Sequence, residues 1–502
     1  MDSEKKFRFH PIWFYIIIIA TTILLSVVLS LLNVQGSQTE VLLNSTSSSV
    51  LTVESLLSAD GIKYIISESV NNFLKFAPLG SLIIGLIGIG LGIKFGYFKS
   101  IFSKCTKFLP RKTMFFIFSL LCIIMGFSND LAFIIMIPLA AVMFTEYKRS
   151  QVIGMTMAFI SVAAGSNINI FITSLDYSLI EMAKSSVSLV DKNYNYGYTG
   201  NLFFIVVSSL LLALLIAILT DILSKNKPVR IGNDEEEILE ALDKRGLRRS
   251  FIALAIMGAI FVYSIIPNLP LSGFLLDTTQ KLYINKLFGA NAPFVNGILY
   301  IISVAFIICS IIYGVATKQV KSERDIVKGL SNSLNGIGEI LLLVFVASQA
   351  IALFKYTNIG TVITSILFDL VKNSNASFVI LILFSMLAIS ISNLILPSIS
   401  SKWALFVPTL LPVFMKSNIT PEFTAGIFRL SSSLTNIITP LFPYFVIYLG
   451  FIGLYSRSDF SINKCYKLIL PYFMAITILW LFIVFGWYVL RVPIGPNVYP
   501  TI

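Results

Sequence analysis

Amide and hydroxyl side chains recur at matching places within the most apolar parts of the sequence. Two long apolar runs contain Ser128-Asn129 and Ser392-Asn393 near their middles, and the apolar segment after each run contains Asn167 or Asn436. Where a helix breaks inside a membrane, its free carbonyls can coordinate Na⁺ and its free N–H groups can bind an anion. Asp130 could ligate a cation or carry a proton. We therefore predict ion binding by Asn129, Asp130, Asn167, Asn393 and Asn436, with helix packing through Ser and Asn as the alternative.

Charged and aromatic side chains near these positions indicate how an anionic substrate could be held. Arg429 lies within the apolar segment 422–450, and Asp176 closes the apolar segment 152–173. A charge at membrane depth is costly and so marks a candidate functional site. Arg429 could hold a carboxylate through two parallel hydrogen bonds, or it could pair with an aspartate and lock two helices together. Trp403 could stack on an aromatic ring, although a core or interface position is equally ordinary for tryptophan.

The elements that carry these residues are expected to be membrane helices. Of the 502 residues, 56% are hydrophobic and 12% are charged, whereas soluble domains contain about 25% charged residues. This composition excludes a soluble enzyme and a disordered chain, and it favours one integral membrane domain over residues 1–502. The net charge of +12 is better explained by basic cytoplasmic loops than by a nucleic-acid partner.

The sequence offers little for catalysis. Its one histidine, His10, precedes the first apolar segment, and its four cysteines form no CxxC pair. A histidine triad, a zinc site and a disulfide framework are therefore not expected. No GxxxxGK[ST] motif for ATP occurs. We predict that the protein is not an enzyme and has no cofactor.

Nine apolar segments match the length of about 20 residues that one membrane crossing needs. They are 12–33, 77–96, 152–173, 200–222, 251–268, 296–314, 335–354, 422–450 and 466–490. Two further runs, 114–144 and 377–413, have polar middles and are too long for one crossing. Basic residues flank 114–144 on both sides, so a re-entrant hairpin keeps both flanks in the cytoplasm. The resulting topology places the N-terminus and the loop 223–250 in the cytoplasm.

These segments form two units of the same order, about 77–222 and about 335–490. The first hairpin is expected to enter from the inside and the second from the outside, so the units are inverted. Inverted repeats with discontinuous helices are typical of secondary transporters, which bind substrate near the membrane midplane. We predict an all-α polytopic membrane protein with about nine transmembrane helices plus two re-entrant hairpins.

Longer motifs extend these observations over most of the chain. They are Phe76-Ala77-Pro78-Leu79-Gly80, Pro138-Leu139-Ala140-Ala141, Leu175-Asp176, Tyr356-Thr357-Asn358-Ile359-Gly360-Thr361, Pro397-Ser398 to Ser401-Lys402-Trp403-Ala404, and Leu434-Thr435-Asn436-Ile437-Ile438-Thr439-Pro440. With the gap from Trp403 to Arg429, they resemble the AbgT family, the p-aminobenzoyl-glutamate transporters.

The resemblance implies nine transmembrane helices plus two re-entrant hairpins, similar to the divalent anion:sodium symporters. It also implies a homodimer in the cytoplasmic membrane of a bacterium, with a small anionic substrate and membrane lipid as partners. Members are implicated in uptake of p-aminobenzoyl-glutamate, and others export p-aminobenzoate and sulfonamide antimetabolites. The coupling ion is expected to be Na⁺ or H⁺. By family match, the positions tied to transport are Asp176, Asn393, Ser400, Trp403, Pro421, Arg429 and Pro440.

Two departures from the family pattern bear on the substrate. The position three residues after Arg429, usually Asp in the family, is Ser432, and the first hairpin tip is contracted to Ser128-Asn129-Asp130. A lost carboxylate near Arg429 removes a proton carrier and a partner for the arginine. A carrier of another small anion, such as a dicarboxylate or a short peptide, is therefore the alternative. A channel or a membrane scaffold is a different class, and the paired broken segments argue against a scaffold.

Overall fold

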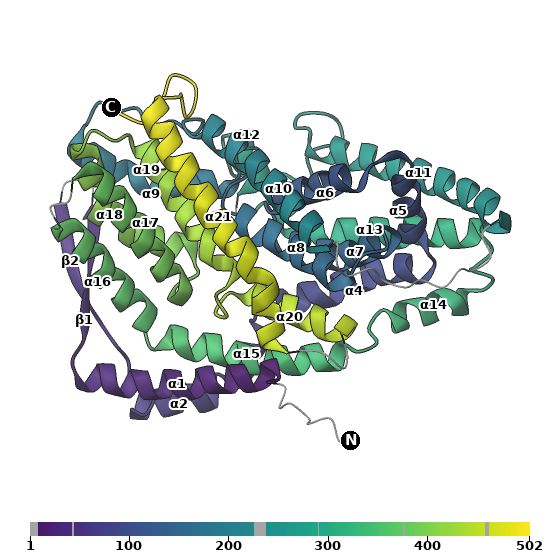
Figure 1. Cartoon of the computed structure of the whole chain (residues 1–502), viewed down its shortest axis with the longest axis horizontal. Helices are drawn as coiled ribbons and strands as arrows, with labels where there is room; N and C mark the ends of the chain where they lie inside the picture. Colours follow the sequence, from purple (N-terminus) through teal and green to yellow (C-terminus); the bar gives the residue numbers. More distant parts are fainter. Residues whose placement is uncertain (1–8, 43–44, 225–236, 290, 375–376, 457–460) are drawn as a thin grey trace. The chain divides into compact units, whose positions relative to one another are not determined.

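Helices form most of the described chain, because a helix satisfies the N–H and C=O groups of backbone that leaves water within its own segment. The computed structural model describes residues 9–42, 45–224, 237–289, 291–374, 377–456 and 461–502 (Figure 1). Residues 1–8 and 225–236, which fall in the predicted cytoplasmic N-terminus and loop 223–250, lie outside the described residues.

Eight helices of the described residues are long and apolar enough to cross a membrane, and the bent pair α4 (Pro78–Lys94) and α5 (Tyr97–Phe108) makes up to nine. This count confirms the prediction of about nine. The helices that make up this count differ in part from the predicted spans. Helices α7 and α17, which were assigned to hairpins, reach the required length, whereas the predicted spans 152–173 and 422–450 contain shorter helices. The α4–α5 pair bends by 65°. Gly96 lies at the bend with a φ of +71°, a conformation that favours glycine.

The two runs predicted as hairpins are each a helix–turn–helix element. The first consists of α6 (Arg111–Met125) and α7 (Asn129–Glu146), and the second of α17 (Phe378–Ile395) and α18 (Ile399–Lys416). The turns, 126–128 and 396–398, lie beside the predicted Ser-Asn pairs, although Asn129 begins α7 and Ser392-Asn393 lie at the end of α17. The membrane side from which each hairpin enters stays a prediction.

The predicted spans 152–173 and 422–450 are both interrupted. Helix α8 (Gln151–Gly165) ends eight residues before the predicted limit, and α9 (Ser174–Val190) begins after the irregular segment 166–173. Helix α19 (Pro421–Leu434) passes into the 3₁₀ turn η1 (Thr435–Ile437) before α20 (Pro443–Ser456). Ser, Thr and Asn side chains compete with helical hydrogen bonds, and proline cannot continue a helix. A long helix follows each interrupted pair, α10 (Leu202–Ser224) in the first half and α21 (Ile462–Leu490) in the second. The element order therefore recurs, while the inverted relation of the halves stays a prediction.

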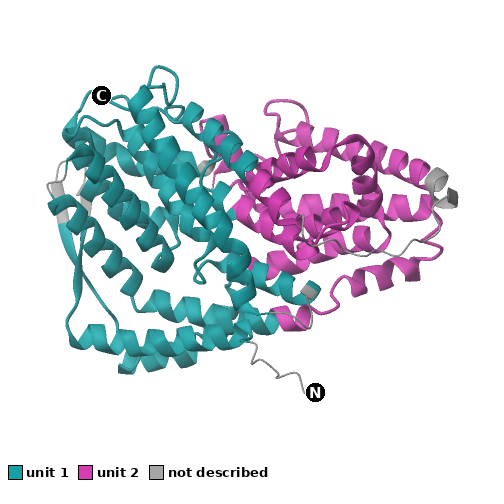
Figure 2. Cartoon of the chain, in the orientation of Figure 1, with its two compact units in different colours: residues 1–76, 163–215, 341–502 teal, residues 77–162, 216–340 magenta. Residues whose placement is uncertain are grey.

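The described chain divides into two compact units (Figure 2). Unit 1 comprises residues 1–76, 163–215 and 341–502, and unit 2 comprises 77–162 and 216–340. The first hairpin thus belongs to unit 2 and the second to unit 1. The further elements of unit 1 are α1 (Pro11–Leu31), β1 (Gln35–Leu42), β2 (Ser45–Thr52), α2 (Ala59–Ser67), α3 (Ser69–Leu74), most of α15 (Ile337–Tyr356) and α16 (Ile359–Asn373); those of unit 2 are α11 (Glu237–Ile265), α12 (Tyr283–Phe288), α13 (Pro293–Ala316) and α14 (Glu323–Asn332).

The antiparallel pair β1–β2 is a feature that the sequence did not predict. Its register runs from Gln35↔Thr52 to Leu42↔Ser45, and β1 lies along α16 (Figure 1). Ser37 donates its backbone N–H to Ser365 Oγ over 2.9 Å and its hydroxyl to Asp369 Oδ2 over 2.7 Å. Two strands alone are marginally stable, so this pair depends on the surface of a helix that is more than 300 residues away in sequence.

Packing within unit 2 surrounds the first hairpin. Most of α7 is buried, and Phe115 of α6 stacks on Phe144 of α7 with ring centroids 4.5 Å apart. Ser250 of α11 donates to the backbone carbonyl of Cys309 in α13 over 2.9 Å. The second of these contacts joins α11 to α13 outside the hairpin, and the hairpin tip at Asn129 is exposed.

Candidate functional site

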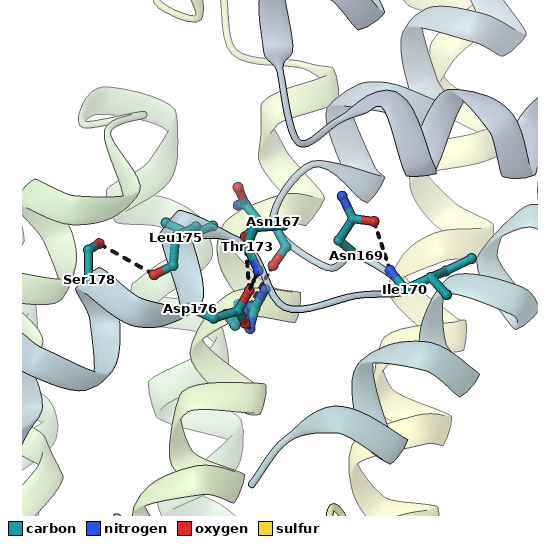
Figure 3. Close-up of polar contacts among 8 residues, drawn as sticks. Asn167, Asn169, Ile170, Thr173, Leu175, Asp176 and Ser178 are labelled. Atoms are coloured by element: carbon teal, nitrogen blue, oxygen red, sulfur yellow. Dashed lines mark hydrogen bonds and ion pairs between the residues drawn. The ribbon is translucent and has the colours of Figure 1, made fainter. Parts of the chain in front are cut away.

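The break between α8 and α9 is organised by the cap of α9. Thr173 and Asp176 form a capping box in which Asp176 Oδ2 accepts from the backbone N–H of Thr173 over 2.8 Å and from its hydroxyl over 2.9 Å (Figure 3). Within the irregular segment, Asn169 Oδ1 accepts from the N–H of Ile170 over 2.8 Å. Such reciprocal caps satisfy backbone donors that a broken helix leaves free. The sequence predicted the break but did not predict the capping role of Asp176.

Arg429 joins α19 to this break. It lies in the middle of α19 and is 2% exposed, while Asp176 is 4% exposed. Arg429 Nη1 forms an ion pair with Asp176 Oδ1, and its Nε donates to the backbone carbonyl of Asn167 over 2.5 Å. Both oxygens of Asp176 are therefore occupied, one by arginine and one by the cap. In this conformation the pair locks two segments together, which was the alternative to a guanidinium that faces a substrate.

Trp403 is fully buried in α18. Its indole N–H donates to the carbonyl of Leu179 in α9 over 2.7 Å. Its ring stacks with Phe406 at 5.5 Å and packs at 56° against Phe428 at 4.7 Å. The indole is thus enclosed by protein and fixes α18 against α9, so in this conformation it has a packing position and not an exposed stacking face.

Two of the predicted asparagines meet in a buried polar chain at the second hairpin tip. Asn393 Nδ2 donates to Asn436 Oδ1 over 2.9 Å, and Asn436 Nδ2 donates to the carbonyl of Ala163 over 3.3 Å. The amino group of Lys402, also fully buried, donates to Asn393 Oδ1. The oxygen predicted to bind Na⁺ therefore accepts a hydrogen bond from a lysine side chain in this conformation. Lys402 was missed as a site residue, although a lysine inside an apolar run was a visible signal.

Hydroxyl groups reinforce the contact between the second hairpin and the second break. Thr435 Oγ1 donates to the carbonyl of Ser390 over 3.0 Å, and Thr439 Oγ1 donates to that of Leu394 over 2.6 Å. Beside these residues, α17, α19 and α21 line a cavity of about 530 Å³ whose walls are mostly apolar and include Trp480. That volume suits a small aromatic molecule, but no charged side chain lines the cavity.

The remaining predicted residues of unit 1 occupy helix starts and breaks. Ser400 is half-buried in the first turn of α18. Pro421 is the first residue of α19, where Thr420 Oγ1 accepts from the N–H of Phe423 over 3.3 Å. Pro440 lies in the break after η1, and its carbonyl accepts from the hydroxyl of Tyr15 over 3.0 Å. Proline suits both places because it has no N–H to satisfy.

Asn129 and Asp130 belong to unit 2, whereas the other three residues of the predicted ion site belong to unit 1. Asn129 is exposed at the start of α7. Asp130 is half-buried and accepts from the hydroxyl of Ser81 over 2.5 Å. Asn167, Asn393 and Asn436 all lie in unit 1.

A small polar cavity beside the ion pair contains residues that the sequence did not single out. It measures about 10 Å³, and Asp176 and Arg429 share its wall with Glu422, Tyr196 and Asn201. Glu422 is 1% exposed and accepts from the hydroxyl of Tyr194 over 2.7 Å. The hydroxyl of Tyr196 and Oδ1 of Asn201 are buried without a hydrogen-bond partner. An acidic residue at the start of the apolar segment 422–450 was the signal available in the sequence.

Comparison with known proteins identifies the family. A sequence model described as "AbgT putative transporter family" matches residues 7–502. The chain belongs to this family. The resemblance found in the sequence is therefore confirmed, and this AbgT-family protein is a multi-pass membrane transporter, a class that is generally not enzymatic.

Relatives match this AbgT-family protein over nearly its whole length. The p-aminobenzoyl-glutamate transport protein of Escherichia coli (strain K12) is 25% identical over 98% of this chain and 94% of its own. The YdaH transporter of Alcanivorax borkumensis is 25% identical with a TM-score of 0.50, over 97% of this chain and 100% of its own. MtrF of Neisseria gonorrhoeae, described within a class of antimetabolite efflux pumps, is 26% identical with a TM-score of 0.49, over 98% of each chain.

Proposed function

We propose that this protein moves p-aminobenzoyl-glutamate or a related aromatic carboxylate, such as p-aminobenzoate, across the bacterial cytoplasmic membrane by ion-coupled secondary transport. The observation that carries the proposal is the buried Arg429 at a broken helix, in a chain that matches a p-aminobenzoyl-glutamate transport protein from end to end. A buried guanidinium can hold a carboxylate in a planar, two-bond geometry that lysine does not reproduce.

The ion pair gives this proposal a mechanism. Arg429 already holds one carboxylate, that of Asp176. A substrate carboxylate must therefore compete with Asp176, which can keep its hydrogen bonds from Thr173 when it leaves the arginine. This exchange keeps Arg429 paired with a carboxylate at both stages, while Asp176 retains two hydrogen bonds from Thr173, so its cost is below that of leaving Arg429 alone without a partner. Movement of α19 relative to the α8–α9 break would then accompany substrate binding, as alternating access requires.

The coupling ion is proposed to be Na⁺ or H⁺, and the assembly a homodimer. Amide and carbonyl oxygens at the breaks suit Na⁺ once Lys402 leaves Asn393, whereas carboxylates such as Asp130 suit a proton. Transport by proteoliposomes under separately imposed Na⁺ and pH gradients distinguishes the two ions. Mass measurement of the purified protein in detergent tests the dimer.

Substrate transport tests the role of Arg429. Proteoliposomes that contain the wild type should accumulate radiolabelled p-aminobenzoyl-glutamate, and Arg429→Lys, which keeps the charge but loses the planar fork, should raise KM by roughly tenfold, about 1.4 kcal/mol of binding. The matched control is Arg324→Ala, at an exposed position of α14. Wild-type kinetics in Arg429→Lys would contradict the proposed grip on the carboxylate.

A second substrate class is favoured by one observation. Ser432, where the family usually has Asp, is fully buried and its hydroxyl has no hydrogen-bond partner. A site without that carboxylate is less repulsive toward a second negative charge, as in a dicarboxylate or a short acidic peptide. Thermal stabilisation of the purified protein by dicarboxylates but not by aminobenzoates would favour this class over aromatic carboxylates.

A further inference from the structure

A second buried carboxylate lies beside the Arg429–Asp176 pair. Glu422 precedes Arg429 by seven residues on α19, which is two helical turns or about 10 Å along the same face. Both side chains line the cavity of about 10 Å³, and Asp176 lines it from α9. Glu422 is 1% exposed. The cavity therefore brings together two carboxylates and one guanidinium from segments about 250 residues apart.

The charges of this cavity do not balance when every group is ionised. Arg429 is matched by Asp176, and the described contact of Glu422 is one hydrogen bond from the hydroxyl of Tyr194. An ionised Glu422 would thus be a buried negative charge without a cation of its own, which is costly. One bound positive charge removes this cost.

The other groups around Glu422 do not supply that charge. From α9, Lys184 pairs with Glu181, and both contact Tyr198. The loop 191–200 contributes Asp191, Tyr194, Tyr196 and Tyr198, and the one cation in its sequence, Lys192, has an exposed side chain. Asn201 at the start of α10 is neutral, and the C-terminal tail contributes backbone carbonyls to Thr420.

The cavity is lined by polar and apolar side chains, and two of its polar groups have no hydrogen-bond partner. The hydroxyl of Tyr196, a residue 6% exposed, lacks a hydrogen-bond partner, as does Oδ1 of Asn201. A volume of about 10 Å³ holds about one water molecule and leaves no room for a hydrated metal cation. One water would accept from Tyr196, donate to Asn201 and lie within reach of Glu422.

We infer that Glu422 is a proton-binding site, which takes a proton through one water held by Tyr196 and Asn201 and releases it when the cavity opens. The proton leaves a hydronium ion in bulk water and forms an O–H bond on the Glu422 carboxyl, and release reverses both changes. Protonation makes the cavity neutral beside an intact Arg429–Asp176 pair. This inference deepens the proposed function by assigning H⁺ coupling to Glu422, in a chain where Ser432 replaces the carboxylate usual in the family.

Infrared difference spectroscopy on the full-length protein tests the site without any substrate. A pH step should produce the carbonyl band of a protonated carboxyl in the wild type and in the control Glu323→Gln, which is exposed on α14. The band should be lost in Glu422→Gln and shifted in Tyr196→Phe. Persistence of the band in Glu422→Gln, or its absence from the wild type, would overturn the proton site.

Transport separates this inference from the proposed function. In proteoliposomes, Glu422→Gln should lose p-aminobenzoyl-glutamate accumulation driven by a pH gradient but retain exchange of labelled for unlabelled substrate, which needs no net proton movement. Accumulation that still follows the pH gradient, or that follows a Na⁺ gradient alone, would contradict proton coupling at Glu422. No substrate movement in the wild type would reject the proposed substrate, while the infrared result still decides the site.

Discussion

The two hairpin tips share a Ser-Asn pair but differ in their surroundings. At the first tip, Asn129 is exposed at the start of α7 and Asp130 accepts from Ser81 within unit 2. At the second, Asn393 is fully buried between Lys402 and Asn436 within unit 1. The asparagine of this pair is thus exposed in one unit and has a central position in a buried polar chain in the other. A tip motif therefore marks where a hairpin turns, while its neighbours decide whether its amide is available to an ion.

The largest effect on stability is expected from Asn393→Ala. The substitution leaves the buried Lys402 amino group without its acceptor and Asn436 Oδ1 without its donor, while Asn436 keeps its bond to the carbonyl of Ala163. An ordinary interhelical hydrogen bond in a membrane protein is worth about 0.6 kcal/mol, but an unsatisfied buried polar group costs about 1 to 3 kcal/mol. Denaturant unfolding in detergent micelles measures the loss, and Asn129→Ala is the matched control. Equal losses in the two variants would abolish the contrast between the tips.

A smaller effect is expected from Asn436→Ala. Asn393 keeps its bond from Lys402, so the change removes one amide–amide bond and one bond to the carbonyl of Ala163. The expected loss is about 1 kcal/mol by the same unfolding measurement. A double mutant with Asn393→Ala should lose less than the two single losses combined, because the residues share a bond. Full additivity would show that the chain does not act as one network.

The smallest effect is expected at the first tip. Asn129→Ala and Asp130→Asn should each change the unfolding free energy by less than about 0.5 kcal/mol, since Asn129 is exposed and an amide at 130 can still accept from Ser81. Transport then becomes the informative readout. If Asp130→Asn leaves stability unchanged but removes dependence on a Na⁺ or pH gradient, the first tip has a role in ion coupling that its exposure permits. Unchanged coupling would restrict ion binding to unit 1.

Much of the architecture was readable from local segments. The run 114–144 was too long for one helix and had a polar middle, and it is a helix–turn–helix with its turn at Gly126–Ser128. The breaks after Gly165 and Leu434 were predicted from Ser, Thr and Asn in apolar context. In contrast, β1–β2 was missed because its strands are mostly Ser, Thr and Gln, and their stability comes from α16.

The site was predictable as a set of positions but not as a set of partners. Arg429 and Asp176 were both singled out because a charged side chain inside a membrane costs free energy, yet the sequence left open whether they pair. Trp403 matched the family motif, and only the structure shows its indole bonded to Leu179. Glu422 was overlooked because the start of a span near water usually tolerates an acid, whereas here Gly200 and Tyr194 cover it.

The sequence by itself determined the membrane class, the approximate number of spans, the helix breaks and the family. These features depend on the free energy of transferring segments of about 20 residues into the membrane and on their backbone chemistry. Both are properties of each segment's own sequence. The tertiary structure alone decided that Arg429 pairs with Asp176, that Asn393 meets Lys402 and Asn436, and that Glu422 shares their cavity wall with the ion pair. A buried polar group must find a partner, but several residues in the chain could satisfy each one. The choice among them depends on which distant helices pack together.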